Sequence, residues 1–207
     1  MGRNSIKDSR QREIVEVFYK VAKKEGLENT SIAKIAKVME VNPSLIIHYF
    51  DTKEELTYAL IDYILDKYLL IYKMGKTSGT EDLRTALAKL IDNMFSKKWN
   101  KLFDDGLFYS CYALTFRNRI VRRKYHQLSN KLRERLTEFL QLCKDSGTIR
   151  IEDPAFTAEL LFVLIDGAYF YLIQMEDKEL YTEKMDAYKR HALSLLGLVE
   201  TGSFRKS

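Results

Sequence analysis

Apolar residues recur every three or four positions along most of the chain, which is the spacing of amphipathic helices. Strand-like alternation is rare, and only 2 prolines and 9 glycines are present to interrupt helices. The pattern therefore predicts an all-α protein. Helices are expected over residues 9–25, 32–39, 43–49, 53–73, 81–94 (capped by Thr80), 117–146, 154–175 and 180–199.

One stretch near the N-terminus holds three helix starts in close succession. Thr30 or Ser31 can cap a short helix. The dipeptide Asn42-Pro43 combines a good N-cap with a proline at the first helical position, so a second short helix is expected to begin there. Residues 52–55 fit a capping box for a third helix. Two short helices joined by a tight turn and supported by others form a helix-turn-helix pattern.

The same stretch resembles the DNA-binding signature of the tetracycline-repressor (TetR) family. In that family a Gly, a Thr before an Ile-Ala pair, a Val-Ser/Asn pair, a Tyr-Phe pair and Lys-x-x-Leu follow one another. The matching residues here are Gly26, Thr30, Ile35-Ala36, Val41-Asn42, Tyr49-Phe50 and Lys53 to Leu56, within a similarity that covers roughly residues 9–60. Where the family usually has glycine in the turn, this chain has Glu40; if the turn needs a positive φ, glutamate costs on the order of 1 kcal/mol there.

This resemblance implies an N-terminal three-helix DNA-binding domain whose second short helix enters the major groove of an operator. Its implied contacts with base edges come from Pro43, Ser44, Leu45 and His48, next to the cap Asn42. Few of these are strong donors, so van der Waals contacts and DNA shape are expected to contribute to specificity. Phosphates would be held through helix N-termini and side chains by Thr30, Ser31, Tyr49 and Lys53.

The remainder of the chain is expected to form a larger helical domain, with residues 1–55 binding DNA and residues 56–207 binding a ligand and forming a dimer. Its aromatic-rich part is either ordinary core or the lining of a cavity for an apolar or cationic small molecule. The resemblance favours the cavity, because the inducer pocket of the family usually lies in this part. The candidate ligand residues are Trp99, Phe103, Phe108, Tyr109, Tyr112 and Phe116, with Tyr63 and with Asp166, which is otherwise a core or interface carboxylate.

The helix expected at 154–175 is apolar on almost every side, so it needs neighbours on two sides. One can be its own domain and the other a second subunit. The resemblance implies a homodimer through the last two long helices, at about 154–175 and 180–199. The alternative is that the second domain binds no small molecule and is only a dimerisation or protein-interaction module.

Charge adds weak support for a nucleic-acid partner. The net charge is +5. Residues 1–53 contain 10 Lys/Arg and 7 Asp/Glu, so +3 of it falls there. This excess is compatible with a surface that faces phosphates. A second basic run, from Arg117 to Arg135, is either a solvated helix face or a second nucleic-acid surface.

Other chemistry is not indicated. The three histidines (His48, His126 and His191) lack ligand-spaced neighbours, and the common catalytic motifs are missing, so neither a metal, a cofactor nor an enzyme is expected. The two cysteines, Cys111 and Cys143, fit a reduced core. Neither a signal peptide nor an apolar stretch of 18 residues is apparent, so a membrane partner is not expected. Together with these observations, the resemblance implies a cytoplasmic homodimeric transcriptional regulator, more often a repressor in this family, that an unidentified small-molecule inducer releases from its operator.

Overall fold

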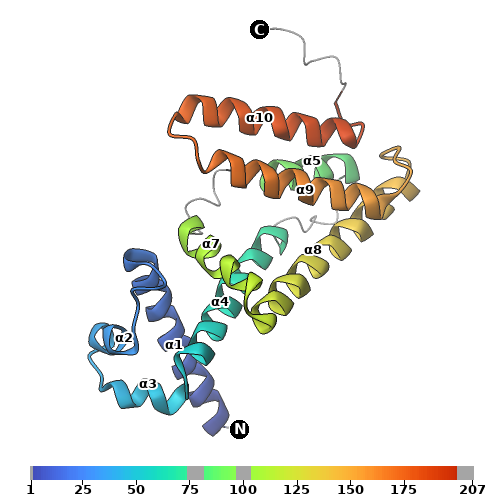
Figure 1. Cartoon of the computed structure of the whole chain (residues 1–207). Coiled ribbons are helices and arrows are strands. Elements are labelled where there is room, and N and C mark those ends of the chain that lie inside the picture. Colours follow the sequence, from blue (N-terminus) through green and yellow to red (C-terminus); the bar gives the residue numbers. More distant parts are fainter. Residues whose placement is uncertain (1, 74–81, 97–103, 200–207) are drawn as a thin grey trace. The chain divides into compact units, whose positions relative to one another are not determined.

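The computed structural model describes residues 2–73, 82–96 and 104–199, with only the backbone described for residues 2–6, 68 and 70–73. Every regular element within these ranges is helical, which confirms the all-α prediction (Figure 1). The elements are α1 (Gly2–Glu25), α2 (Ile32–Met39), α3 (Pro43–Tyr49), α4 (Lys53–Lys73), α5 (Leu83–Met94), α7 (Asp105–Ala113), the 3-10 helix η1 (Leu114–Phe116), α8 (Arg119–Asp145), α9 (Pro154–Leu172) and α10 (Lys178–Leu195).

The chain divides into two compact units. Unit 1 comprises Met1–Tyr68 and Asn100–Gln127, and unit 2 comprises Leu69–Trp99 and Leu128–Ser207. Unit 1 therefore contains α1, α2 and α3 together with most of α4, α7, η1 and the first turns of α8. The predicted domain boundary between residues 55 and 56 stays a prediction.

Unit 1 is organised around α1, which packs against α2, α3 and α7. The apolar stripe of α1 is nearly inaccessible to solvent, with Ile14 at 0% and Phe18 at 1% exposure. Ile35 of α2 and Ile46 of α3 are buried to the same degree. Burial of a side chain of this size contributes about 1.5–3 kcal/mol, so these residues fix the two short helices on α1.

The turn between α2 and α3 has the backbone that the sequence suggested. Glu40 adopts φ 56° and ψ 39°, the only positive φ of a non-glycine residue in the described ranges. The following residue, Val41, donates its N–H to Ala36 O at 3.0 Å and closes the end of α2. A non-glycine residue in this left-handed conformation costs on the order of 1 kcal/mol, so the chain keeps the geometry of the turn with Glu40 at a small energetic cost.

Most helix starts lie within about two residues of the prediction, but the start of α1 and the cap of α5 differ from it. Helix α1 begins at Gly2 rather than at residue 9, because the polar residues before Ser9 carry no apolar stripe that would reveal a helix. Helix α5 is capped by Asp82 rather than by Thr80, which lies outside the described residues. The Asp82 carboxylate accepts the N–H of Thr85 at 2.9 Å and its hydroxyl at 2.7 Å, and its negative charge suits the positive end of the helix.

Unit 2 has a single apolar core built from α5, the second half of α8, α9 and α10. Helix α10 packs on both α9 and α5. Cys143 lies in this core and Cys111 is buried in unit 1, both as free thiols, as predicted.

Helix α9 is apolar on two faces, and only one of them is covered. Its buried residues are Ala158, Leu161, Ile165, Ala168 and Leu172. Its exposed side carries Phe156 (57%), Leu160 (38%), Val163 (65%) and Phe170 (60%). The sequence analysis expected no stretch apolar enough to cross a bilayer. That expectation is wrong for α9, which is long enough and apolar enough by length and composition. Core helices of soluble proteins can have the same length and apolar composition, and one face of α9 packs into the core of unit 2.

Candidate nucleic-acid interface

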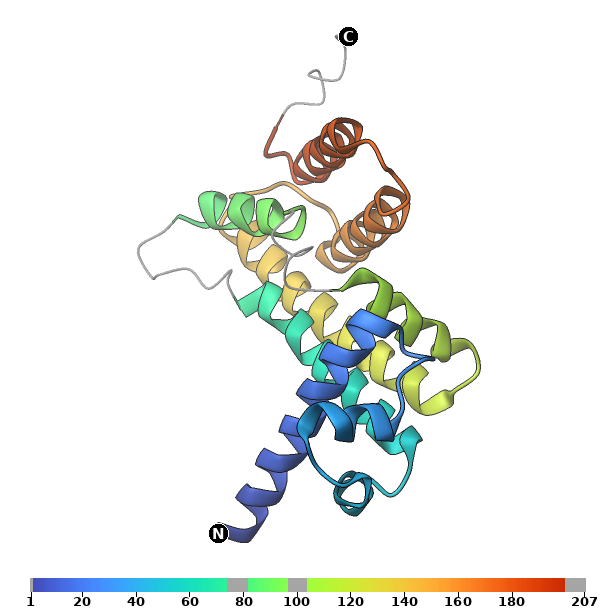
Figure 2. The same cartoon turned by 90° about the vertical axis from the view of Figure 1, so that its left-hand side faces the viewer.

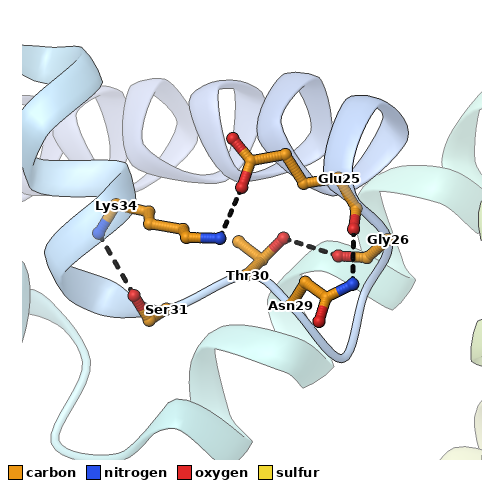
Figure 3. A network of polar contacts seen from close by, with 6 residues as sticks. All are labelled: Glu25, Gly26, Asn29, Thr30, Ser31 and Lys34. Atoms are coloured by element: carbon orange, nitrogen blue, oxygen red, sulfur yellow. Dashed lines mark hydrogen bonds and ion pairs between the residues drawn. The ribbon is translucent and has the colours of Figure 1, made fainter.

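The loop from α1 to α2 is fastened to the end of α1 (Figure 3). Gly26 ends the helix with φ 88°, a conformation that favours glycine. The side chain of Asn29 donates to Glu25 O at 2.9 Å, and the hydroxyl of Thr30 donates to Gly26 O at 2.8 Å. Because the side chain of Thr30 is only 1% exposed, it fixes the loop and does not face the solvent where a phosphate would bind.

The start of α2 is capped by Ser31, the second of the two predicted candidates. Its hydroxyl accepts the N–H of Lys34 at 3.3 Å. The ammonium of Lys34 in turn lies 2.6 Å from the Glu25 carboxylate and holds the pKa of that carboxyl below its usual range. Ser31 is exposed, so the positive end of α2 is open to solvent.

Helix α3 is held at both ends. The Asn42 side-chain oxygen accepts from the N–H of Ser44 at 2.9 Å and from its hydroxyl at 2.8 Å. At the other end, Gln11 on α1 donates to Tyr49 O at 3.0 Å, a contact that no local sequence signal indicates. Between them Ile46 is completely buried, so one face of α3 is fixed in the unit.

The opposite face of α3 is open to solvent. Pro43, Ser44 and His48 are exposed there, whereas Leu45 and Tyr49 are half-buried. Ile47 is 49% exposed and belongs to the same face, although the sequence interpretation did not include it. Its spacing of three residues from Ser44 was the signal that could have identified it.

The start of α4 completes this surface. The N–H of Glu55 donates to the Thr52 hydroxyl at 3.1 Å, and the Glu55 carboxylate accepts the N–H of Asp51 at 3.0 Å. The first bond confirms Thr52 as the predicted cap of α4, whereas the glutamate of the predicted capping box bonds to the N–H of Asp51, one residue before the cap, and not to that of Thr52. Lys53 is exposed and makes no ion pair with any residue that the structure describes. Unit 1 thus presents a short exposed helix with the capped starts of α2 and α4 beside it in the chain, a geometry suited to a groove with phosphates on its rim.

The predicted ligand residues that the structure describes fall into separate groups. Trp99 and Phe103 lie outside the described residues. In unit 1, Tyr63 packs edge-to-face on Tyr19 of α1 at 5.5 Å between centroids. Lys67 Nζ lies 4.4 Å from the centre of the Tyr63 ring. Tyr63 is therefore engaged with α1.

The aromatic residues of α7 gather around Tyr125 of α8. Phe108 and Tyr112 lie edge-to-face to Tyr125, with centroids 5.6 Å and 5.4 Å away, and Tyr109 contacts Phe108 at 5.5 Å. Phe116 contacts Tyr112 at 6.0 Å but is 71% exposed. These side chains form a packed cluster with one open edge.

The eighth predicted residue, Asp166, belongs to unit 2 and lies on the exposed side of α9. Its apolar surroundings raise the pKa of its carboxyl to about 6. A groove of about 530 Å³ in unit 2 lies between α8 and the start of α9, and its lining includes none of the predicted ligand residues that the structure describes. Its charged lining consists of Arg133, Glu134, Glu138 and Glu159.

Comparison with solved structures agrees with this architecture. A TetR transcription regulator from Haloarcula marismortui superimposes with a TM-score of 0.79 at 19% identity, over 92% of this chain and 97% of that one. A TetR-family regulator from Cytophaga hutchinsonii gives 0.75 at 16% identity, over 94% and 96%. A putative regulator from Saccharomonospora viridis, solved in complex with choline, gives 0.71 at 17% identity, over 92% and 96%. At these identities the likeness concerns the fold.

Sequence comparison identifies the family of the chain. A helix-turn-helix-type transcriptional regulator of Staphylococcus aureus strain USA300 is 34% identical over 99 residues, 46% of this chain and 53% of that protein. The chain thus spans about half the length of the curated relatives it matches. The family model of bacterial regulatory proteins of the tetR family matches residues 14–60, and that of the tetracyclin repressor-like C-terminal domain matches residues 82–198. Because the second match alone covers more than half of the chain, the protein belongs to the TetR family of helix-turn-helix transcriptional regulators, a class of regulators rather than enzymes.

Proposed function

We propose that this protein is a homodimeric repressor that binds operator DNA through α3 and is released by a small apolar or cationic molecule. The observation that carries the proposal is the solvent-exposed face of α3. The other face of this helix is buried in unit 1, its start is capped by Asn42 and its end is bonded to α1. The face combines apolar groups with a hydroxyl and an imidazole, so it would read bases by shape and van der Waals contact as much as by hydrogen bonds. Such a protein acts where the chromosome lies, in the cytoplasm.

The surrounding groups would hold the DNA backbone. Ser31, Asn42, Tyr49 and Lys53 are all open at least in part to solvent, and Ser31 and Lys53 stand at helix N-termini, where the macrodipole favours a phosphate. Pro43, Ser44, Ile47 and His48, with the half-buried Leu45 beside them, would face the base edges. Thr30 takes the role of fixing the loop that presents Ser31.

Lys53→Ala tests the backbone part of this assignment. Because a phosphate contact is independent of sequence, binding should weaken by the same factor on the selected operator and on random duplex DNA. The slope of log K against log salt should become shallower by about 0.9. Lys178→Ala is a matched control, since it removes an exposed lysine from α10 in unit 2. Loss of affinity for the operator alone would show that Lys53 reads bases instead.

The exposed stripe of α9 supports the homodimer. Phe156, Leu160, Val163 and Phe170 recur at helical spacing on its open side, and Leu180 and Leu195 of α10 are also partly exposed. Soluble proteins rarely leave such an extended apolar surface uncovered. A second copy that contributes the same two helices would bury both stripes in a four-helix interface.

Asp166 gives this interface an expected pH dependence. Its carboxyl already has a raised pKa of about 6 on the open side of α9, and burial against a second copy would raise it further. Dimer formation then takes up protons, so the dimer should tighten by about tenfold or more as pH falls from about 8 to about 6, and level off below. Sedimentation equilibrium across this range measures the effect. Asp166→Asn should abolish the dependence; an unchanged pH profile in that variant would place Asp166 outside the interface.

Release by a ligand draws on one neighbour in fold. A neighbour in fold was solved with choline, a cation of the kind that aromatic rings bind. The packed aromatic cluster around Tyr125 supports the rival function, a second domain that only dimerises or binds proteins. Native mass spectrometry of the purified protein separates the two. A small molecule that co-purifies and weakens operator binding supports release, and a protein that carries none supports the dimerisation module.

A further inference from the structure

The corner between α7 and α8 carries a basic run in unit 1. Residues 117–124 contain five cationic side chains and no acidic one. Two of the five are engaged: Arg122 donates to the carbonyl oxygens of Thr115 and Phe116 at 2.9 and 3.2 Å, and Lys124 pairs with Asp62 at 2.7 Å. The other three, Arg117, Arg119 and Arg123, are exposed and have no partner among the residues that the structure describes.

Two contacts place this corner next to the start of α4. Asn118 donates to the Glu54 carboxylate at 3.1 Å and to the Tyr58 hydroxyl at 2.8 Å. One turn and a half further on, Lys124 reaches Asp62. Since both helices advance in the same direction between these contacts, the first turns of α8 run parallel to α4, and the two helices begin at the same end of unit 1 (Figure 2).

The backbone of this corner is held rigidly. Asn118 caps α8 by accepting the N–H groups of Ile120 and Val121 at 2.9 and 3.1 Å. Arg122 fastens the carbonyls that precede it, and Tyr58 also bonds to Glu54, next to Lys53. A charged group on a fixed backbone loses less freedom when it binds, so the corner is preorganised for an anionic partner.

We propose that Arg117 and Arg119 bind phosphates of the same DNA whose groove α3 enters, and so extend the backbone contacts beyond Lys53. The inference rests on the proposed DNA binding. Guanidinium groups match phosphate oxygens with two parallel hydrogen bonds. An acidic protein surface could satisfy the same charges, but the position of Arg117 and Arg119 at the end of unit 1 that bears Lys53 favours DNA. Arg123, a helical turn or about 6 Å further along α8, lies away from that end.

The test is a comparison of salt slopes on a mixed-sequence DNA duplex three helical turns long. In Arg117→Gln/Arg119→Gln, the slope of log K against log salt should become shallower by about 1.8, because two phosphate contacts are lost. Between about 50 and 200 mM salt, wild type should then lose about tenfold more affinity than the variant. Arg123→Gln should keep the wild-type slope, and Arg117→Lys/Arg119→Lys should keep most of it. These side chains make no hydrogen bond or ion pair with the residues that the structure describes, so circular dichroism should show unchanged melting.

The controls separate failure of the inference from failure of the proposed function. If wild type binds duplex DNA and Lys53→Ala shows the shallower slope, while the double glutamine variant keeps the wild-type slope, the inference is wrong and an acidic protein becomes the better partner. A slope change of the same size in Arg123→Gln would also overturn the inference, because the change would then follow from the net charge of the protein and not from contacts at specific positions. If wild type shows no salt-dependent binding to any duplex, both the proposed function and the inference fail.

Discussion

Val163→Glu/Phe170→Glu should convert the protein to a folded monomer. The two side chains are 65% and 60% exposed, so unit 2 does not need them to fold. In the proposed dimer, four new carboxylates would be buried without partners, at about 3–5 kcal/mol for each uncompensated charge. Even one such penalty raises the dissociation constant of the dimer about a thousandfold. Operator binding should fall with it, because a monomer offers one recognition helix where the dimer offers two.

Sedimentation velocity at micromolar concentration measures this effect, and thermal unfolding checks that the fold is intact. Leu142→Glu is the matched control, since Leu142 is a 52% exposed leucine on α8 and should leave the dimer unchanged. Leu164, also on α9, is a less suitable target, because it packs partly into the core of unit 2 and a charge there would impair folding as well. A double glutamate variant that sediments as a dimer would contradict the proposed interface.

The neighbouring isoleucines of α3 should behave oppositely when each is replaced by alanine. Ile46 is 0% exposed, so Ile46→Ala should lower the free energy of unfolding by about 2–5 kcal/mol through lost burial and a residual cavity. Ile47 is 49% exposed, and Ile47→Ala should change stability by no more than about 0.5 kcal/mol. Its effect should instead be a loss of preference for the operator over random DNA, because a contact with bases is removed.

Urea denaturation and competition binding together distinguish the two variants. Each serves as the control for the other, since the chemical change is the same and the positions are adjacent. Equal destabilisation by both would mean that the two faces of α3 are not the buried and open faces described here. Unchanged operator preference in Ile47→Ala would remove this side chain from the base-reading surface.

Local signals in the sequence located well the helix starts that frame the proposed DNA-binding surface. The pair Asn42-Pro43 and the capping box at 52–55 act over a few residues, so they can be read without knowledge of the fold. The sequence prediction chose Thr80 as the cap of α5, whereas the cap is Asp82. Both residue types can cap a helix, and which of two nearby candidates does so depends on where the helix packs. Periodicity also showed that α9 is apolar on two faces, but it could not show which face the core covers.

Contacts between distant segments could not be predicted from the sequence. Two hydrogen bonds, from Gln11 to Tyr49 O and from Asn118 to Glu54, join residues that come together only in the folded chain. Neither donor side chain belongs to a recognisable motif. The burial of Thr30 is similar: a threonine at a helix start can face a phosphate or turn inward, and the choice follows from the carbonyl of Gly26 at the end of α1. The aromatic residues near α7 could be either core or cavity lining, since both use the same side chains.

The most direct test of the central claim is selection of bound sequences from a random duplex library by the purified wild-type protein. If two copies of α3 read successive major grooves, the enriched sequences should be inverted repeats whose half-site centres lie about 10 base pairs or a multiple of this apart. The complexes should contain two chains, or a multiple of two, per duplex. Recovery of sequences with no enrichment over the starting library, or of single half-sites bound by one chain, would contradict the account.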